Sequence, residues 1–391
     1  MFETLSYLAL QQYWWIIIAI LWSTLVFMMF VQWGQTLFYE ISKTEKDKSL
    51  IINAFWKHYK LTFSVLITFG WAIFASFPIF YSTSFGWAYL VWMAILFVFI
   101  IQAVSYEYRT KMSNFLWQKT YEVFLFINGL LWPLLIWIAL ATFFTWWNFV
   151  IDQTNLVNSF APHHIITSWT TPFYWLEALW NTRELAFITN ISLWLTVVFL
   201  IRTLANLYII NHVKDKNINI SNIKSLKINT IFLIIFFFIF VFKLFTISGF
   251  SYDINNVITI IEYKYLNNIL EMPLVFCIFV FWLILYFIGI FLWIIKDYKR
   301  SFWISWVWVF FLVFSLFMIV GLNNTSFYPS LSDLQSSLTI ENSSSSKYTL
   351  TVMSYVSLLL PFVLSYTLWA WKVISPKKMS KSNLKKDFDV Y

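Results

Sequence analysis

The chain alternates long apolar segments with short polar ones. A helix needs roughly 20 mainly apolar residues to cross the hydrocarbon core of a bilayer. Runs of about that length lie near residues 13–37, 61–81, 85–105, 120–145, 187–210, 228–248, 273–295, 302–321 and 350–374. The pattern predicts an all-α polytopic membrane protein, a bundle of about nine transmembrane helices that occupies residues 1–374 as one domain, with a tail at 375–391. Because the polar connection Ser82–Ser84 is short, we expect the second and third spans to form an antiparallel hairpin.

Lysine and arginine orient this predicted bundle, because positive residues in short loops stay in the cytoplasm. Most of the 26 basic residues fall in one alternating set of loops and in the C-terminal tail. The opposite set of loops holds only Arg183, Lys264 and Lys347, while Arg202 and Lys243 lie inside spans. We therefore expect the N-terminus outside the cell and the C-terminus in the cytoplasm.

Composition excludes several classes of protein. Only 11% of the residues are charged and 60% are hydrophobic, with a mean hydropathy of +0.72, whereas a soluble domain keeps about a quarter of its residues charged. The net charge of +8 does not indicate a nucleic-acid partner, because the basic residues are scattered between apolar runs. The one cysteine, Cys277, excludes an intrachain disulfide, and four histidines leave few places for metal or heme chemistry.

Tryptophan and glycine occur in inverted proportions. The chain has 24 Trp and 7 Gly, although average glycine usage is near 7% and membrane helices are richer in glycine than soluble ones. Several tryptophans lie where small residues normally let helices approach closely, as in Trp33-Gly34 and Gly70-Trp71. We hypothesise that many of these tryptophans are glycine in the cell, from a genome in which UGA encodes glycine and was translated here as tryptophan.

Several long strings resemble subunit II of cytochrome bd-type quinol oxidases. The N-terminal half carries FVQWGQTLF at 30–38, INAFWKHYKLTF at 52–63, FGWAIFASFPIFYSTSFGWAY at 69–89, IIQAVSYEYRTK at 100–111 and NFLWQKTYEVFLFINGLLWPLLI at 114–136. The C-terminal stretch at 323–371, which begins NNTSFYPSLSDLQSS, is similar to the same family. The resemblance spans the chain and is weakest between about 211 and 295.

The resemblance implies a heterodimeric, proton-translocating terminal oxidase of the bacterial cytoplasmic membrane, which oxidises quinol and reduces dioxygen to water in aerobic respiration. Subunit I would carry three hemes, of types b and d, and would perform the redox steps. This chain would be its pseudo-symmetric partner of nine helices, without a heme or metal of its own, and would stabilise subunit I and assist the access of protons or dioxygen. Quinone, the lipid bilayer and a small single-helix accessory subunit are further implied partners, and the type of quinone stays open.

The resemblance also bears on the tryptophans. The family typically has glycine at five positions where this sequence has tryptophan, which supports the recoding hypothesis independently of the composition. These positions are Trp33, Trp71, Trp87, Trp117 and Trp132.

Ionisable residues within membrane spans are costly and are therefore candidates for function. Arg202, in the fifth span, is explained either by snorkelling or a structural ion pair, or by contact with a heme propionate or another subunit. The string Glu107-Tyr108-Arg109 matches the family's acidic-Tyr-Arg signature and is either an end-of-helix charge cluster or a fixed carboxylate and guanidinium near a proton entrance. Glu122 is a second acidic candidate, although an acid in the first turn of a helix also compensates the helix dipole.

Other positions depart from the family pattern. Lys60 stands where the family commonly has a carboxylate proposed to help feed protons, and Gln32 and Gln102 stand where other branches carry Asp and Arg. A lysine is a different proton donor, with an ordinary pKa near 10.4. The proton route would then use Glu107 or Glu122, or would run wholly through subunit I.

Two other functional classes compete with the oxidase. A secondary transporter fits the composition and topology, but transporters tend to have internal repeats, and no repeat is visible in this sequence. A membrane-bound transferase would need catalytic His, Asp or Glu residues clustered at one interface. No such cluster appears, and the adjacent pair His163-His164 lacks the helical spacing of a metal pair.

Overall fold

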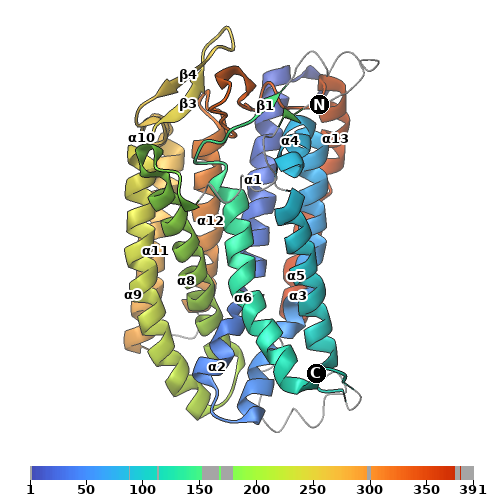
Figure 1. Cartoon of the computed structure of the whole chain (residues 1–391), viewed down its shortest axis with the longest axis vertical. Coiled ribbons are helices and arrows are strands. Elements are labelled where there is room, and N and C mark those ends of the chain that lie inside the picture. The colour runs from blue at the N-terminus through green and yellow to red at the C-terminus, as the bar shows by residue number, and fades with distance from the viewer. Residues whose placement is uncertain are drawn as a thin grey trace.

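The computed structural model describes residues 2–87, 89–111, 114–151, 167–168, 179–296, 301–374 and 379. Long helices stand side by side along the long axis of the molecule, and short strands and loops cover one end (Figure 1). The side chains of several helical residues, Gln32, His58 and Lys60 among them, lie outside the described part. The predicted helical membrane architecture is confirmed.

The N-terminal half of the bundle is built from the helices of one continuous stretch. They are η1 (Phe2–Thr4), α1 (Tyr7–Gln32), η2 (Gly34–Leu37), α2 (Phe38–Ile41), α3 (Glu45–Ser76), α4 (Pro78–Trp87), α5 (Tyr89–Tyr108) and α6 (Trp117–Ala141).

The remaining elements complete the bundle and its cap. They are β1 (Val150–Ile151), β2 (Thr167–Ser168), η4 (Arg183–Leu185), α8 (Ala186–His212), α9 (Lys216–Thr246), β3 (Gly249–Tyr252), β4 (Ile258–Ile261), α10 (Lys264–Glu271), α11 (Pro273–Lys296), α12 (Ser301–Gly321), η5 (Leu334–Ser336), α13 (Lys347–Ser357) and α14 (Leu360–Ile374). Strands β1 and β2 pair antiparallel, as do β3 and β4.

Each predicted span coincides with a helix or with a bent pair of helices. Within the described residues, four helices are long and apolar enough to cross a membrane, and three bent pairs would raise the number to seven. The remaining two predicted spans correspond to α6 and α12. The multi-pass membrane character is therefore clear, whereas the number nine stays a prediction.

The second span differs from its prediction at a proline. Residues 82–84 continue helix α4 and do not form a connection, so the predicted position of the connection at Ser82–Ser84 is wrong. The break lies at Phe77, between α3 and α4, where the helix axis bends by 111°. The ring of Pro78 disfavours helical geometry in the residue before it, and Phe77 has φ −130° and ψ 68°.

Helix α3 begins well before the apolar run that predicts it. Thr44 accepts a hydrogen bond from the N–H of Asp47, and the Asp47 side chain accepts one from the N–H of Thr44. This reciprocal capping box satisfies backbone donors that a helix start otherwise leaves unpaired. Helical structure therefore extends from Glu45 through residues that the hydropathy pattern assigns to a loop.

Two glycines mark the closest helix contacts. A Cβ on Gly34 would lie 2.1 Å from the Cβ of Ala205, so η2 packs directly on α8. A Cβ on Gly321 would lie 2.0 Å from the ring of Trp15, where α12 meets α1. Neither position accepts a larger residue unless the neighbouring residue shifts.

Loops and strands close the end of the bundle that is predicted to face outward. Strand β3 bridges to the loop after α12 through Ser251 and Thr325. Asn268 of α10 donates hydrogen bonds to the carbonyl of Ile319 and to Thr325 Oγ1, both at 2.7 Å. The long loops after the sixth and eighth predicted spans thus form an ordered cap over α10 and α12.

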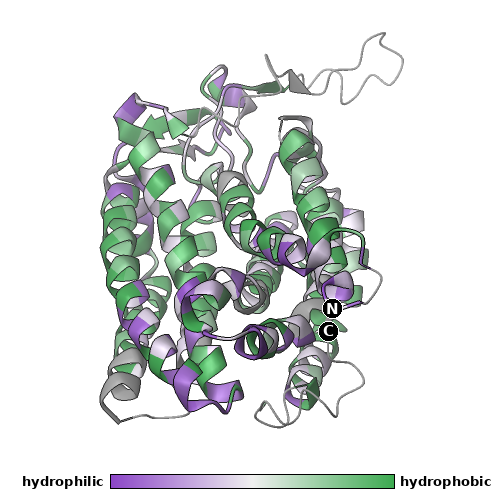
Figure 2. Ribbon diagram, turned by 60° about the horizontal axis from the view of Figure 1, so that its bottom comes forward, coloured by the Kyte–Doolittle hydropathy of each residue, from purple (hydrophilic) through white to green (hydrophobic). Residues whose placement is uncertain are grey.

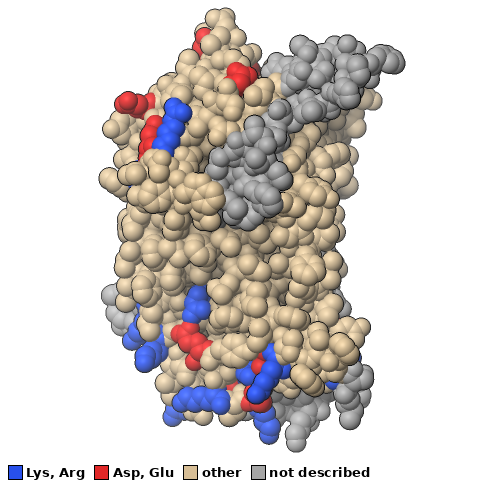
Figure 3. All heavy atoms as spheres, viewed as in Figure 1, with Lys and Arg blue, Asp and Glu red and all other residues tan. Residues whose placement is uncertain are grey.

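Charge and hydropathy divide the molecule along its long axis. Hydrophobic residues run along the helices and hydrophilic ones gather at their ends (Figure 2). On the visible face, lysine and arginine side chains concentrate at the end opposite the β3–β4 hairpin (Figure 3). Large apolar side chains are exposed along the middle of the bundle, as at Phe97 of α5, Phe238 of α9 and Phe281 of α11. This distribution suits a bilayer, and the direction of insertion stays a prediction.

Candidate functional site

The most buried charges of the described residues lie between α3, α5 and α6. Arg109 directly follows α5 and Glu122 lies in the second turn of α6. The Arg109 Nη2 and Nε atoms lie 2.7 and 3.1 Å from Glu122 Oε1. Both side chains are almost fully buried, with exposed fractions of 0% and 1%. We call these two residues, with Lys48, Glu45 and Ser49, the Arg109–Glu122 network.

Helix α3 supplies the other members of the network. Lys48 Nζ lies 2.8 Å from Glu122 Oε2 and 2.8 Å from Glu45 Oε1, and Arg109 Nη1 donates to Ser49 Oγ at 3.1 Å. Burial would lower the pKa of Lys48, but its hydrogen bonds to Glu122 and Glu45 outweigh burial and raise that pKa above the ordinary 10.5. Two cations and two carboxylates therefore balance, which is the condition for burying charge. The network joins three helices at one end of the bundle.

The first acid of the family signature lies apart from this network. Glu107 is partly exposed and its carboxylate lies 3.6 Å from Lys111 Nζ, one helical turn away. An exposed pair at this spacing contributes little to stability. The two charged residues of the signature thus have different partners: Arg109 pairs with the buried Glu122, whereas Glu107 pairs with Lys111 and is partly open to solvent.

Arg202 forms a second polar centre. Its guanidinium makes an ion pair with Glu40 of α2, donates to Thr36 Oγ1 at 2.9 Å and donates to Asn229 Oδ1 at 2.8 Å. These partners come from η2, α2 and α9, so Arg202 connects the N-terminal and central parts of the bundle. A structural ion pair is therefore present, and contact with a heme propionate or another subunit is untested.

Uncharged polar side chains continue inward from the Arg109–Glu122 network along α5. Gln35 Nε2 donates to the Tyr106 hydroxyl at 2.7 Å. Gln102 and Ser105 are fully buried, and their side-chain polar atoms have no hydrogen-bond partner within the described residues. The other positions that depart from the family pattern, Lys60 and Gln32, have side chains outside the described part.

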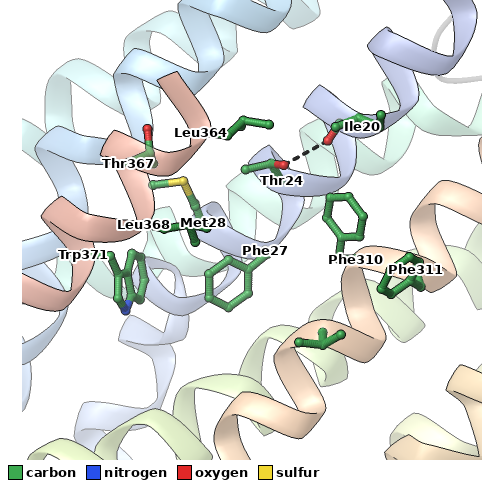
Figure 4. A pocket seen from close by; sticks show the side chains of 11 residues that line it. Ile20, Thr24, Phe27, Met28, Phe310, Phe311, Leu364, Thr367, Leu368 and Trp371 are labelled. Atoms are coloured by element: carbon green, nitrogen blue, oxygen red, sulfur yellow. Dashed lines mark hydrogen bonds between the residues drawn. The ribbon is translucent and has the colours of Figure 1, made fainter. Parts of the chain in front are cut away.

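Apolar cavities lie within the described part of the bundle, and two of them are large enough to hold a small molecule. One, of about 300 Å³, lies between α1, α12 and α14 and is drawn in Figure 4. Its two hydroxyls are satisfied by their own helices, since Thr24 donates to the carbonyl of Ile20 and Thr367 to that of Val363. The other, of about 420 Å³, lies between α1, α3, α5 and α6, with Phe99 and Trp132 in its wall. Carbon surfaces of this kind suit hydrocarbon groups.

An axial ligand for heme would have to come from a histidine or a similar side chain that faces such a space. No described histidine lines either cavity. His212 stacks on Tyr208 and its Nδ1 lies 2.9 Å from the Tyr208 carbonyl oxygen at the end of α8. The pair His163-His164 lies outside the described residues. The described histidines therefore supply no axial ligand at these cavities. Met28 lines the first cavity and Met93 the second, and no step is assigned to a heme in this chain.

Comparison with known proteins decides the family. The family model described as "Cytochrome bd terminal oxidase subunit II" matches residues 10–374. The chain belongs to the cytochrome bd terminal oxidase subunit II family. The match covers every predicted span, so the resemblance noted in the sequence is confirmed over nearly the whole chain.

Individual relatives of the family match shorter stretches. A probable cytochrome oxidase subunit 2 of Haemophilus influenzae is 33% identical over 89 residues, which are 23% of this chain and 24% of the relative. Subunit 2 of the cytochrome bd-I ubiquinol oxidase of Escherichia coli is 25% identical over 113 residues, 29% and 30% of the two chains. Subunit 2 of the cytochrome bd ubiquinol oxidase of Bacillus subtilis is 25% identical over 139 residues, 35% and 40%.

The fold extends further than this sequence similarity. A chain of the bd oxidase structure from Geobacillus thermodenitrificans superposes with a TM-score of 0.55 and 12% identity. The superposition covers 94% of this chain and 97% of the other. The two chains thus share this arrangement of helices although few of their residues are identical.

Proposed function

We propose that this chain is subunit II of a membrane-bound cytochrome bd-type oxidase that oxidises quinol and reduces dioxygen to water. The observation that supports the proposal most directly is the family match over residues 10–374. The proposed location is the bacterial cytoplasmic membrane, with the N-terminus outside and the proposed tail at 375–391 in the cytoplasm. Hemes b and d belong in subunit I in this proposal, and a single-helix accessory subunit and quinone are further proposed partners.

In this proposal the main role of the chain is to stabilise subunit I. The Arg109–Glu122 network and the Arg202–Glu40 pair fix the helix ends that subunit I would need held in place. Glu107 is the proposed acid for proton uptake, because it is exposed whereas Glu122 is held between two cations. Lys60 is a second proposed member of that route, and the apolar cavities are proposed to ease the passage of dioxygen.

An optical spectrum of the native complex tests the proposal. The complex would be isolated from membranes through a tag on this chain, and the co-purifying polypeptide would be identified by mass. We expect a reduced-minus-oxidised spectrum with a chlorin-type heme d band beside b-type bands. A heme-free single polypeptide in an intact preparation would overturn the oxidase and favour a secondary transporter.

A further inference from the structure

Helix α9 carries lysines on one exposed face near its N-terminus. Lys216, Lys224 and Lys227 are exposed, and at 100° per residue they fall within a sector of about 80°. We call these three residues the α9 lysine stripe. Two exposed isoleucines, Ile220 and Ile228, lie on the same side of the helix. The face is therefore basic and apolar together, unlike a fully solvated charged face.

The length of α9 places this stripe at the boundary of the bilayer. The helix has 31 residues and spans about 46 Å, whereas the hydrocarbon core is about 30 Å thick. Its mainly apolar part runs from Ile228 to Thr246 and contains Lys243 in the last turn. About ten residues at the start of α9 therefore project into the headgroup layer.

The opposite side of this segment is already packed. Ile218, Asn222 and Leu226 are fully buried, and Asn222 Nδ2 donates to the Asn206 carbonyl oxygen of α8 at 2.9 Å. The stripe cannot turn inward without breaking this contact. Its lysines consequently point away from the packed interior of the described bundle.

The stripe also lacks acidic partners in the chain. Among the described residues, none of its three lysines makes an ion pair with a carboxylate. Glu40 of α2 lies on an element packed against α9, but its carboxylate is bound to Arg202. Asp215 accepts hydrogen bonds from the N–H groups of Asn217 and Ile218 at the helix start. These three positive charges thus have no carboxylate partner in the part of the chain that the structure describes, and they can attract an external anion.

We propose that the α9 lysine stripe binds the headgroup of an anionic phospholipid, with the acyl chains lying on the exposed isoleucines and the apolar part of α9. Lysines next to a membrane span attract anionic headgroups, each with an effect of several-fold on affinity. The proposal depends on the membrane location of the chain and does not depend on its oxidase activity.

Lipid retention by the isolated complex tests the site. The complex would be delipidated in a neutral detergent, mixed with phosphatidylglycerol, and examined by native mass spectrometry. We expect the triple variant Lys216→Gln, Lys224→Gln, Lys227→Gln to bind about a hundredfold more weakly than the wild type. Inorganic phosphate at the same concentration should not displace the lipid, because it lacks chains that contact isoleucine.

A matched control variant distinguishes binding at the α9 lysine stripe from a general attraction of the lipid to exposed lysines. The control is a triple variant that removes three exposed lysines elsewhere on the same predicted side of the membrane: Lys43→Gln, Lys46→Gln, Lys119→Gln. It should retain the lipid as the wild type does. Equal loss in both variants, or no loss in the stripe variant, overturns the proposed site. The optical spectrum should be unchanged in both variants, so a failed oxidase assignment would be recognised separately.

Discussion

At position 117 the backbone conformation suits glycine better than tryptophan. Trp117 begins α6 with φ 59°, in the left-handed region, and its side chain is 79% exposed. Such a conformation costs a non-glycine residue about 1–2 kcal/mol, and an exposed ring gains little packing in return. By contrast, Trp33 and Trp132 are buried and stacked with their ring centroids 4.5 Å apart. The structure accommodates those two tryptophans, so position 117 gives the clearer support for recoding.

We predict that the codon for Trp117 is UGA and that the protein made in its own cell has glycine there. The same holds for Trp33, Trp71, Trp87 and Trp132. Peptide masses from the native protein check this directly, because a glycine and a tryptophan at each of the five positions give different masses. UGG codons at these positions would exclude the hypothesis.

The Arg109–Glu122 network gives a second prediction at this scale. Glu122→Gln leaves Arg109 and Lys48 buried beside a neutral amide, and removing one partner of a buried pair typically costs about 3–5 kcal/mol. We expect a clear fall in the midpoint of thermal unfolding of the detergent-solubilised complex. Glu107→Gln, which removes the exposed acid, should change stability by less than about 1 kcal/mol. Similar falls in the unfolding midpoint for both substitutions would show that burial does not determine how much each ion pair contributes to stability.

At the scale of elements, the apolar runs predicted the helices well and predicted their ends poorly. Hydropathy detects the part of a helix that meets lipid, so the extension of α3 back to Glu45 was missed. The string Thr44-Glu45-Lys46-Asp47 carries the capping signal that could have located it. Similarly, Phe77-Pro78 marks the break that was assigned to Ser82–Ser84, because a proline disfavours helix in the residue before it.

The candidate site was predicted in parts for the same reason. Arg109 and Glu122 were each identified from the sequence, but their contact depends on how α5 and α6 meet, which no local pattern encodes. Lys48 and Ser49 were missed because they were assigned to a loop. Once α3 is known to begin at Glu45, both residues fall on a helix that faces Arg109.

The start of α3 yields a prediction of its own. Thr44→Ala removes the side-chain acceptor of the capping box, and such a loss typically costs about 0.5–2 kcal/mol. We expect lower thermal stability of the complex and faster amide hydrogen exchange over the first turns of α3. Thr44→Ser keeps the acceptor and should behave as the wild type. Identical exchange in the alanine and serine variants would contradict the role of the cap.

At the scale of the whole molecule, basic residues gather at one end and the capped loops at the other. This asymmetry underlies the predicted direction of insertion. In a Cys277→Ser background, Lys347→Cys should react with a membrane-impermeant maleimide added to intact cells. Lys216→Cys should react only after the membrane is opened. Labelling in the reverse order would invert the topology.

The far C-terminal segment returns to the bundle through a single described residue. The N–H of Met379 donates to the His212 carbonyl oxygen at 2.7 Å, and the N–H of Lys214 donates to the Met379 carbonyl oxygen at 2.8 Å. The turn between α8 and α9 thereby forms an isolated β-bridge, Val213 with Met379, to a residue that follows the last helix. Since a ribosome makes Met379 after all the described helices, this pairing can form only once α14 has been synthesised. In the predicted topology the last residues made would therefore close the cytoplasmic turn between α8 and α9.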